Sequence, residues 1–111
     1  YIYKKLASNT STTNITTKIL EITNAELIVG AIYKIDAVVL VNKGASASDS
    51  DMYIRHGSSV LVETIATGTY WNTHSLSTVV EYTSGGINLS GNSNGKQINS
   101  AGTVIIATRV A

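Results

Sequence analysis

The 111-residue chain contains no cysteine and no proline. Without cysteine it can form no disulfide, no thiolate metal site and no cysteine nucleophile, so its stability must come from packing or assembly. Without proline, its turns must be built from Gly, Asn and Ser. Charge is also scarce, because Lys and Arg number 8 against 7 Asp and Glu and are dispersed along the chain. We therefore expect neither nucleic acid nor a membrane surface as a partner.

Long hydrophobic runs are absent as well. No apolar run approaches the roughly 20 residues that span a bilayer, and no charged segment precedes a hydrophobic one at the N-terminus. The chain begins with Tyr1 rather than Met and stops at Ala111 just after an apolar run, so we interpret it as a processed chain or a segment of a longer protein. Its length suits one domain with its own core.

The residues that are abundant favour β structure. Val, Ile and Thr number 10, 13 and 14, so a third of the chain is β-branched, a shape that suits a pleated sheet better than a helix. Ser, Thr, Asn and Gly supply another large share and predict polar, weakly charged loops. The composition therefore predicts an all-β protein.

Alternation and turn residues predict about eight short strands. We expect an antiparallel β-sandwich with a jelly-roll-like order, in which 1–14 is an N-terminal arm and 15–111 is the sandwich domain. The first and last strands are both apolar, so the ends of the chain should pair deep in a sheet. SGNSNGK at 90–96 reads as a flexible loop. The strands are expected within residues 1–6, 15–23, 32–41, 51–56, 60–65, 69–72, 76–82, 87–89 and 103–110.

The strand at 33–41 carries one fully apolar row and one mixed row. The apolar row predicts the core and comprises Tyr33, Ile35, Ala37, Val39 and Val41. The second row is polar at its start and apolar in its middle, at Val38 and Leu40, and the strand at 103–110 repeats this pattern. Exposed apolar residues in mid-sheet indicate a subunit contact, which we place at Val38, Leu40, Ile105 and Ala107. The alternative is cover by the same chain, for example by 1–14.

A second candidate surface is the cluster Tyr70, Trp71, Asn72 and His74. An exposed aromatic ring beside hydrogen-bonding groups suits a sugar or a protein partner. Because successive strand residues point in opposite directions, only one of the two rings can be outside, and the favoured interpretation places one ring in the core and the other at a sheet edge.

Catalytic and metal-binding patterns are weak. His56 and His74 could join Asp36, Asp49 or Asp51 and a serine in a Ser-His-Asp arrangement, but no nucleophile elbow is present, and both histidines are expected at the surface. The D-x-D at 49–51 lacks the other ligands of a calcium loop. We predict no enzyme activity, no metal and no cofactor. The N-x-S/T patterns at Asn9, Asn14 and Asn88 receive no function.

Four stretches, following the polar opening, carry a resemblance to a known family. The chain resembles the small jelly-roll domains, of the tumour-necrosis-factor or C1q-like type, that recur in bacteriophage virion proteins such as tail fibres, head fibres and capsid decoration subunits. The stretches are LEITNAELIVGAIYKIDAVVLV at 20–41, ASDSDMYIRHG at 47–57, INLSG at 87–91 and AGTVIIATRVA at 101–111.

This resemblance implies a non-enzymatic shell or fibre component, located in the virion, that acts as a trimer or a larger symmetric homo-oligomer with other virion proteins. Two alternatives stay open. One is a carbohydrate-binding module centred on Tyr70 or Trp71. The other is a secreted filament subunit whose strand at 1–6 completes the sheet of a neighbour.

Overall fold

The computed structural model describes residues 1–111 and consists almost entirely of strands, with two short 3-10 helices. Neither helix has the length or apolar character needed to cross a membrane. The elements are β1 (Ile2–Lys5), β2 (Lys18–Ile22), η1 (Asn24–Glu26), β3 (Ile32–Asn42), β4 (Ser50–His56), β5 (Ser59–Ala66), β6 (Trp71–Glu81), β7 (Ile87–Asn92), β8 (Gln97–Ile98), η2 (Ser100–Gly102) and β9 (Val104–Arg109).

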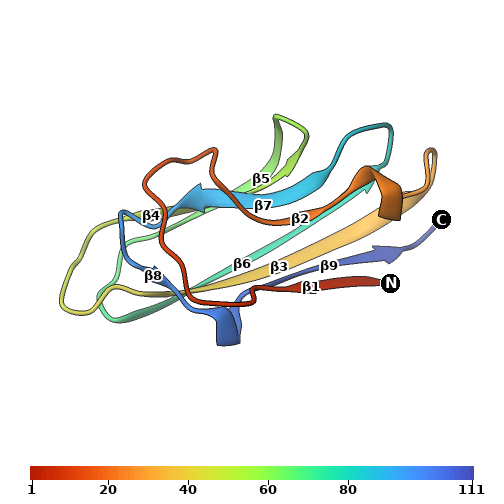
Figure 1. The fold of residues 1–111 in the computed structure, drawn as a ribbon. Helices are drawn as coiled ribbons and strands as arrows, with labels where there is room; N and C mark the ends of the chain where they lie inside the picture. Colours follow the sequence, from red (N-terminus) through yellow and green to blue (C-terminus); the bar gives the residue numbers. More distant parts are fainter.

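The strands form two antiparallel sheets that pack face to face (Figure 1). The first sheet has the order β1-β9-β3-β6, and β8 also pairs with β3. The second sheet has the order β2-β7-β4-β5. The predicted all-β antiparallel sandwich is therefore confirmed.

The pairing is nested along the chain, which is the arrangement of a jelly roll. The hairpin β4–β5 is innermost, and β3–β6, β2–β7 and β1–β9 enclose it in turn. Both termini consequently lie at the same end of the molecule (Figure 1). The two ends of the chain pair as expected, although β1 forms the edge of its sheet rather than its interior.

Three elements differ from their predicted form. β6 is one strand of 11 residues where two separate pieces were expected, because its polar residues Thr73, Ser75 and Ser77 all point outward while it pairs with β3 along its whole length. β7 continues to Asn92, into the predicted loop. β8 is only two residues long and was not predicted.

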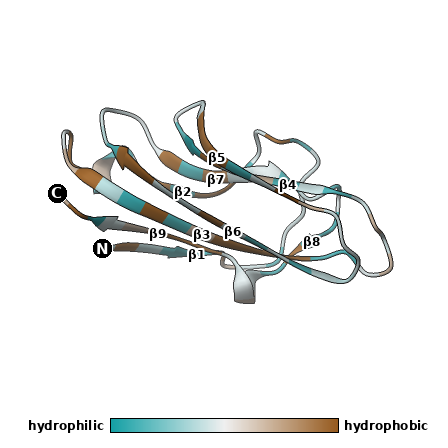
Figure 2. Cartoon of the chain, turned by 180° about the vertical axis from the view of Figure 1, so that it is seen from behind, coloured by the Kyte–Doolittle hydropathy of each residue, from teal (hydrophilic) through white to brown (hydrophobic).

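The core lies between the sheets and is filled by alternate residues of the strands. All five predicted inner residues of β3 are buried. In Figure 2, hydrophobic and hydrophilic segments alternate over the first half of this strand, and its second half is continuously hydrophobic. The opposing sheet contributes a matching set: Ile22, Met52, Ile54, Ile87 and Leu89.

The predicted N-terminal arm begins as a strand and then crosses between the sheets. Ile2–Lys5 pairs with β9 of the same chain. Further on, the backbone of Thr10 pairs with Ile98, and the Thr12 hydroxyl donates to the carbonyl of Gly91 at 2.7 Å. The strand that a filament subunit would donate to a neighbour is thus already paired within its own chain.

Candidate functional site

The first candidate surface is the outer face of the sheet β1-β9-β3-β6. On this face Val38 lies directly opposite Val104, and Tyr3 lies directly opposite Ile106. Leu40 follows Val38 along the same row of β3. We call the set Tyr3, Val38, Leu40, Val104 and Ile106 the outer strip.

Ile105 and Ala107 do not belong to this surface, and their predicted place in a subunit contact is wrong. Both are fully buried in the core. The β3–β9 register sets Ile105 opposite Ala37 and Ala107 opposite Ile35, which are inner residues. Because both rows of β9 are apolar, alternation alone could not show which row faces inward.

Part of the outer strip is covered by the same chain. Leu40 packs against η2, where a Cβ atom on Gly102 would lie only 2.8 Å from the Cβ of Leu40. The backbone of Leu40 is also held here, because its carbonyl accepts from the N–H of Asn99 at 2.8 Å. This cover of Leu40 comes from 99–102, and the side chain of Asn9 in the predicted arm accepts from the N–H of Ser100 at 2.8 Å. Val38 and Leu40 both stay half-buried.

The second candidate surface is the pair Tyr70 and Trp71, whose side chains are both exposed, at 61% and 56%. The expectation that only one ring could be outside is wrong, because Tyr70 has a φ of 55° and this left-handed conformation breaks the alternation. Two backbone hydrogen bonds hold it there. The N–H of Tyr70 donates to Gly44 at 2.6 Å, and its carbonyl accepts from Lys43 at 2.7 Å.

The other two residues predicted for this surface have internal roles. The Asn72 side chain closes the preceding turn, accepting from the N–H of Gly68 at 3.0 Å and donating to the carbonyl of Thr69 at 3.1 Å. His74 points into the core and is 1% exposed, so neither its predicted surface position nor its place in a ligand contact holds.

His74 is the centre of a buried polar cluster. Its Nε2 lies 2.7 Å from the hydroxyl of Ser50 and its Nδ1 lies 2.6 Å from the hydroxyl of Thr64. A neutral imidazole satisfies both hydroxyls, donating through one nitrogen and accepting through the other. Burial, reinforced by the nearby charge of Lys43, lowers the pKa of His74 from 6.5 to about 4.

Lys43 is a second buried titratable residue at this end of the core. Its Nζ donates to the carbonyl of Ala66 at 2.7 Å. Burial lowers the pKa of Lys43, while Asp49 and Asp51 partly oppose this shift. The two carboxylates of the D-x-D pattern thus favour the charged form of Lys43. No group of three or more acidic or histidine side chains is placed to hold a metal ion.

The Ser-His pair is not completed by an aspartate. The hydroxyl of Thr64 occupies the side of the His74 ring where a catalytic triad has a carboxylate. Ser50 and His74 are both almost entirely closed off from solvent. Asp36 is elsewhere, accepting from the hydroxyl of Ser77 at 2.8 Å on the outer face of the first sheet.

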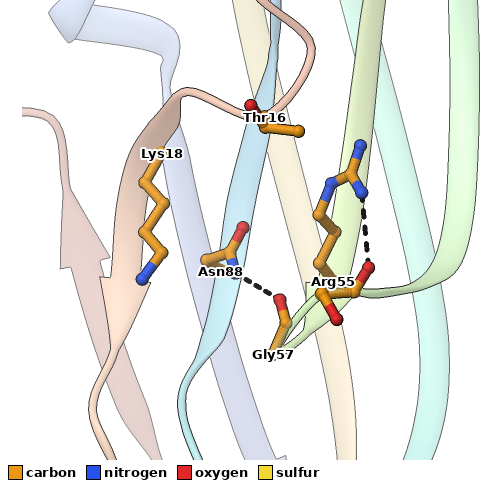
Figure 3. Close-up of a pocket in the computed structure, with 6 residues that line it drawn as sticks. Thr16, Lys18, Arg55, Gly57 and Asn88 are labelled. Atoms are coloured by element: carbon orange, nitrogen blue, oxygen red, sulfur yellow. Dashed lines mark hydrogen bonds between the residues drawn. The ribbon is translucent and has the colours of Figure 1, made fainter.

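A polar pocket on the outer face of the second sheet was not predicted from the sequence (Figure 3). Residues from β2, β4 and β7 and from the loops beside them meet there. Alternation within a single strand does not show which strands become neighbours, so it could not predict this pocket. The lining residues are Thr16, Lys18, Arg55, Gly57, Ser58 and Asn88.

No protein-family model matches the chain, and no curated protein is significantly similar to it.

Proposed function

We propose that this chain is a non-enzymatic structural component of a phage or virus particle, a capsid decoration or fibre module, that works by binding further copies of itself. The observation that carries the proposal is the outer strip, which places apolar side chains of three neighbouring strands on a face that one copy leaves partly open. The nested jelly-roll pairing agrees with the family that the sequence resembles.

The physical driving force is removal of the outer strip from water. Each Å² of apolar surface buried contributes about 25 cal/mol, and a symmetric assembly repeats the same contact in every subunit. Tyr3, which is 51% exposed at the strip's edge, has the most surface to lose.

The charges beside the strip fit a second copy of the chain. Lys34 and Asp36 lie on the same face with Nζ and Oδ2 3.9 Å apart, so this region carries one charge of each sign. A surface with both signs can meet its own copy without net repulsion of like charges.

The test is the mass of the native particle by light scattering. We expect the natural chain to be an oligomer, and the double variant Val38→Glu, Ile106→Glu to be a monomer, because two carboxylates would have to be desolvated at the contact. Val60→Glu is the matched control, since Val60 is an exposed valine on the other sheet. A monomeric natural chain, or a folded double variant with unchanged mass, would contradict the proposal.

The aromatic pair supports a second candidate function, carbohydrate binding. Tyr70 is held in a conformation that non-glycine residues rarely adopt, and the result is two adjacent exposed rings. Trp71→Ala should then abolish binding on a glycan array while leaving the mass of the assembly unchanged. If binding persists in this variant, the second candidate fails.

A further inference from the structure

The polar pocket on the outer face of β2, β7 and β4 has the features of a built ligand site. Its volume is about 300 Å³, at the lower end of the roughly 300–1,000 Å³ of small-molecule pockets. Asn88 on β7 forms the floor and is 2% exposed, while Thr16 and Lys18 lie beside it at the rim and are exposed (Figure 3). No hydrophobic side chain lines it.

The floor of the pocket carries an unsatisfied acceptor. The Nδ2 of Asn88 donates to the carbonyl of Gly57 at 3.3 Å, which fixes the orientation of the amide. Its Oδ1 is buried and has no hydrogen-bond donor, and it is the one buried side-chain polar atom of the protein in this condition. Such an atom is costly to retain, so its presence beside a pocket points to a donor supplied from outside the chain.

Arg55 forms the wall of the pocket and is held rigidly. Its guanidinium lies 4.6 Å from the centre of the Tyr53 ring, and its Nε donates to the hydroxyl of Ser90 at 2.9 Å. The two terminal nitrogens donate to the carbonyls of Ser58 and Ile15 at 3.4 and 3.3 Å. A guanidinium has five N–H groups, so two of them stay available to a ligand.

The second cation is at the rim. Lys18 is exposed and its Nζ lies 2.8 Å from the Oε2 of Glu21, so it can turn toward the pocket without losing a buried contact. The unused N–H groups of Arg55 suit a carboxylate, which Lys18 can join by leaving Glu21. The Oδ1 of Asn88 instead requires a hydrogen-bond donor and repels a bare anion. A ligand that satisfies both groups carries a carboxylate and hydroxyls on one small frame.

We propose that this pocket binds a sugar acid, a monosaccharide unit with a carboxylate. The carboxylate binds Arg55 and Lys18, and a ring hydroxyl donates to the Oδ1 of Asn88 once the exposed side chain of Thr16 moves aside. The site lies on the opposite sheet from the outer strip and from Trp71, so it is independent of both functions proposed above.

The test is an NMR titration of the natural chain with glucuronate, glucose and acetate, followed through the backbone amides of residues 16, 18, 55, 57, 58 and 88. Glucuronate should give saturable shifts confined to these residues, because it alone satisfies both the cations and Asn88. Glucose and acetate, which each carry half of the required groups, should bind at least about tenfold more weakly. Acetate as effective as glucuronate, or no saturable shift with glucuronate, would overturn the proposal.

Two variants separate the ligand role from a structural one. Asn88→Leu removes the unsatisfied oxygen at a similar side-chain size, and with it the bond from Nδ2 to the carbonyl of Gly57. The two losses oppose each other, so the variant should lose glucuronate binding while its unfolding temperature stays close to that of the natural chain. Lys18→Ala should weaken binding roughly tenfold, whereas its control Lys34→Ala, an equally exposed lysine on the other sheet, should not. Unchanged binding in Lys18→Ala would contradict the proposal even if Asn88→Leu fails to fold.

Discussion

At the scale of single residues, the buried polar cluster of His74 shows how the sandwich keeps polar groups in its interior. The ring is fully surrounded, and both of its nitrogens have a hydroxyl partner, from Ser50 and Thr64. The buried Lys43 lies close enough to disfavour a second positive charge. The cluster is therefore stable with a neutral imidazole, and protonation of the ring destabilises it.

This arrangement predicts a loss of stability in acid. The folded pKa of His74 is about 4 and lies below the unfolded value of 6.5, so the unfolded chain binds the proton more readily. The neutral His74 ring therefore contributes to the free energy of unfolding, and this contribution is fully present above pH 6.5. It is lost as the pH falls from 6.5 toward 4, which lowers the free energy of unfolding by up to roughly 3 kcal/mol. Urea unfolding at pH 7, 5.5 and 4 measures it.

Two variants assign this pH dependence. His74→Gln should flatten the stability profile between pH 6.5 and 4, because no group at that position titrates. His56→Gln should preserve it, since His56 lies near the surface with its Nε2 2.8 Å from the carbonyl of Ser84. An equally steep profile in His74→Gln would assign the effect to other groups.

At the scale of elements, strand register decides which residues reach the surface. β9 has apolar residues on both rows, and only its pairing with β3 places Ile105 inside and Ile106 outside. β7 shows the same dependence, because its second half, residues 90–92, was predicted as a loop yet continues the strand that lies between β2 and β4. Gly91 of β7 lies at a point where the backbone of β4 comes very close.

Substitution of Gly91 tests this close approach. A Cβ atom there would collide with the backbone of Asp51 and come within 3.0 Å of the Cα of Met52, neither of which can move aside. Gly91→Ala should therefore destabilise the fold by about 2 kcal/mol or more. The control is Gly86→Ala, where the nearest atoms belong to the flexible side chain of Glu21 and the cost should stay under about 1 kcal/mol. Equal denaturation midpoints for the two variants would show that β7 is not held this tightly.

At the scale of the whole molecule, nested pairing joins segments that are distant in the sequence. β1 and β9 pair across nearly the full length of the chain, and β2 pairs with β7. Chain ends must therefore be brought together before the outer pairs form, which slows folding in proteins dominated by such contacts. The absence of proline removes a different source of slow kinetics.

Refolding at a concentration below assembly should thus proceed in milliseconds to seconds without a later phase. Chains that contain proline add a phase of tens to hundreds of seconds, because X-Pro bonds isomerise in the unfolded state. Stopped-flow refolding after short and long delays in denaturant should give the same amplitudes. A slow phase that grows with the delay would contradict this expectation.

β-branched composition and two-residue alternation are local properties of the chain, and they were sufficient to predict the fold class, most strand positions and the inner row of β3. Other features could be read only from the folded molecule. The register with β3 decides which row of β9 faces inward. The backbone conformation of Tyr70 exposes both aromatic rings. The pocket around Asn88 is formed by three strands that meet only in the folded sheet. These features arise from contacts between distant segments, which a local pattern does not encode.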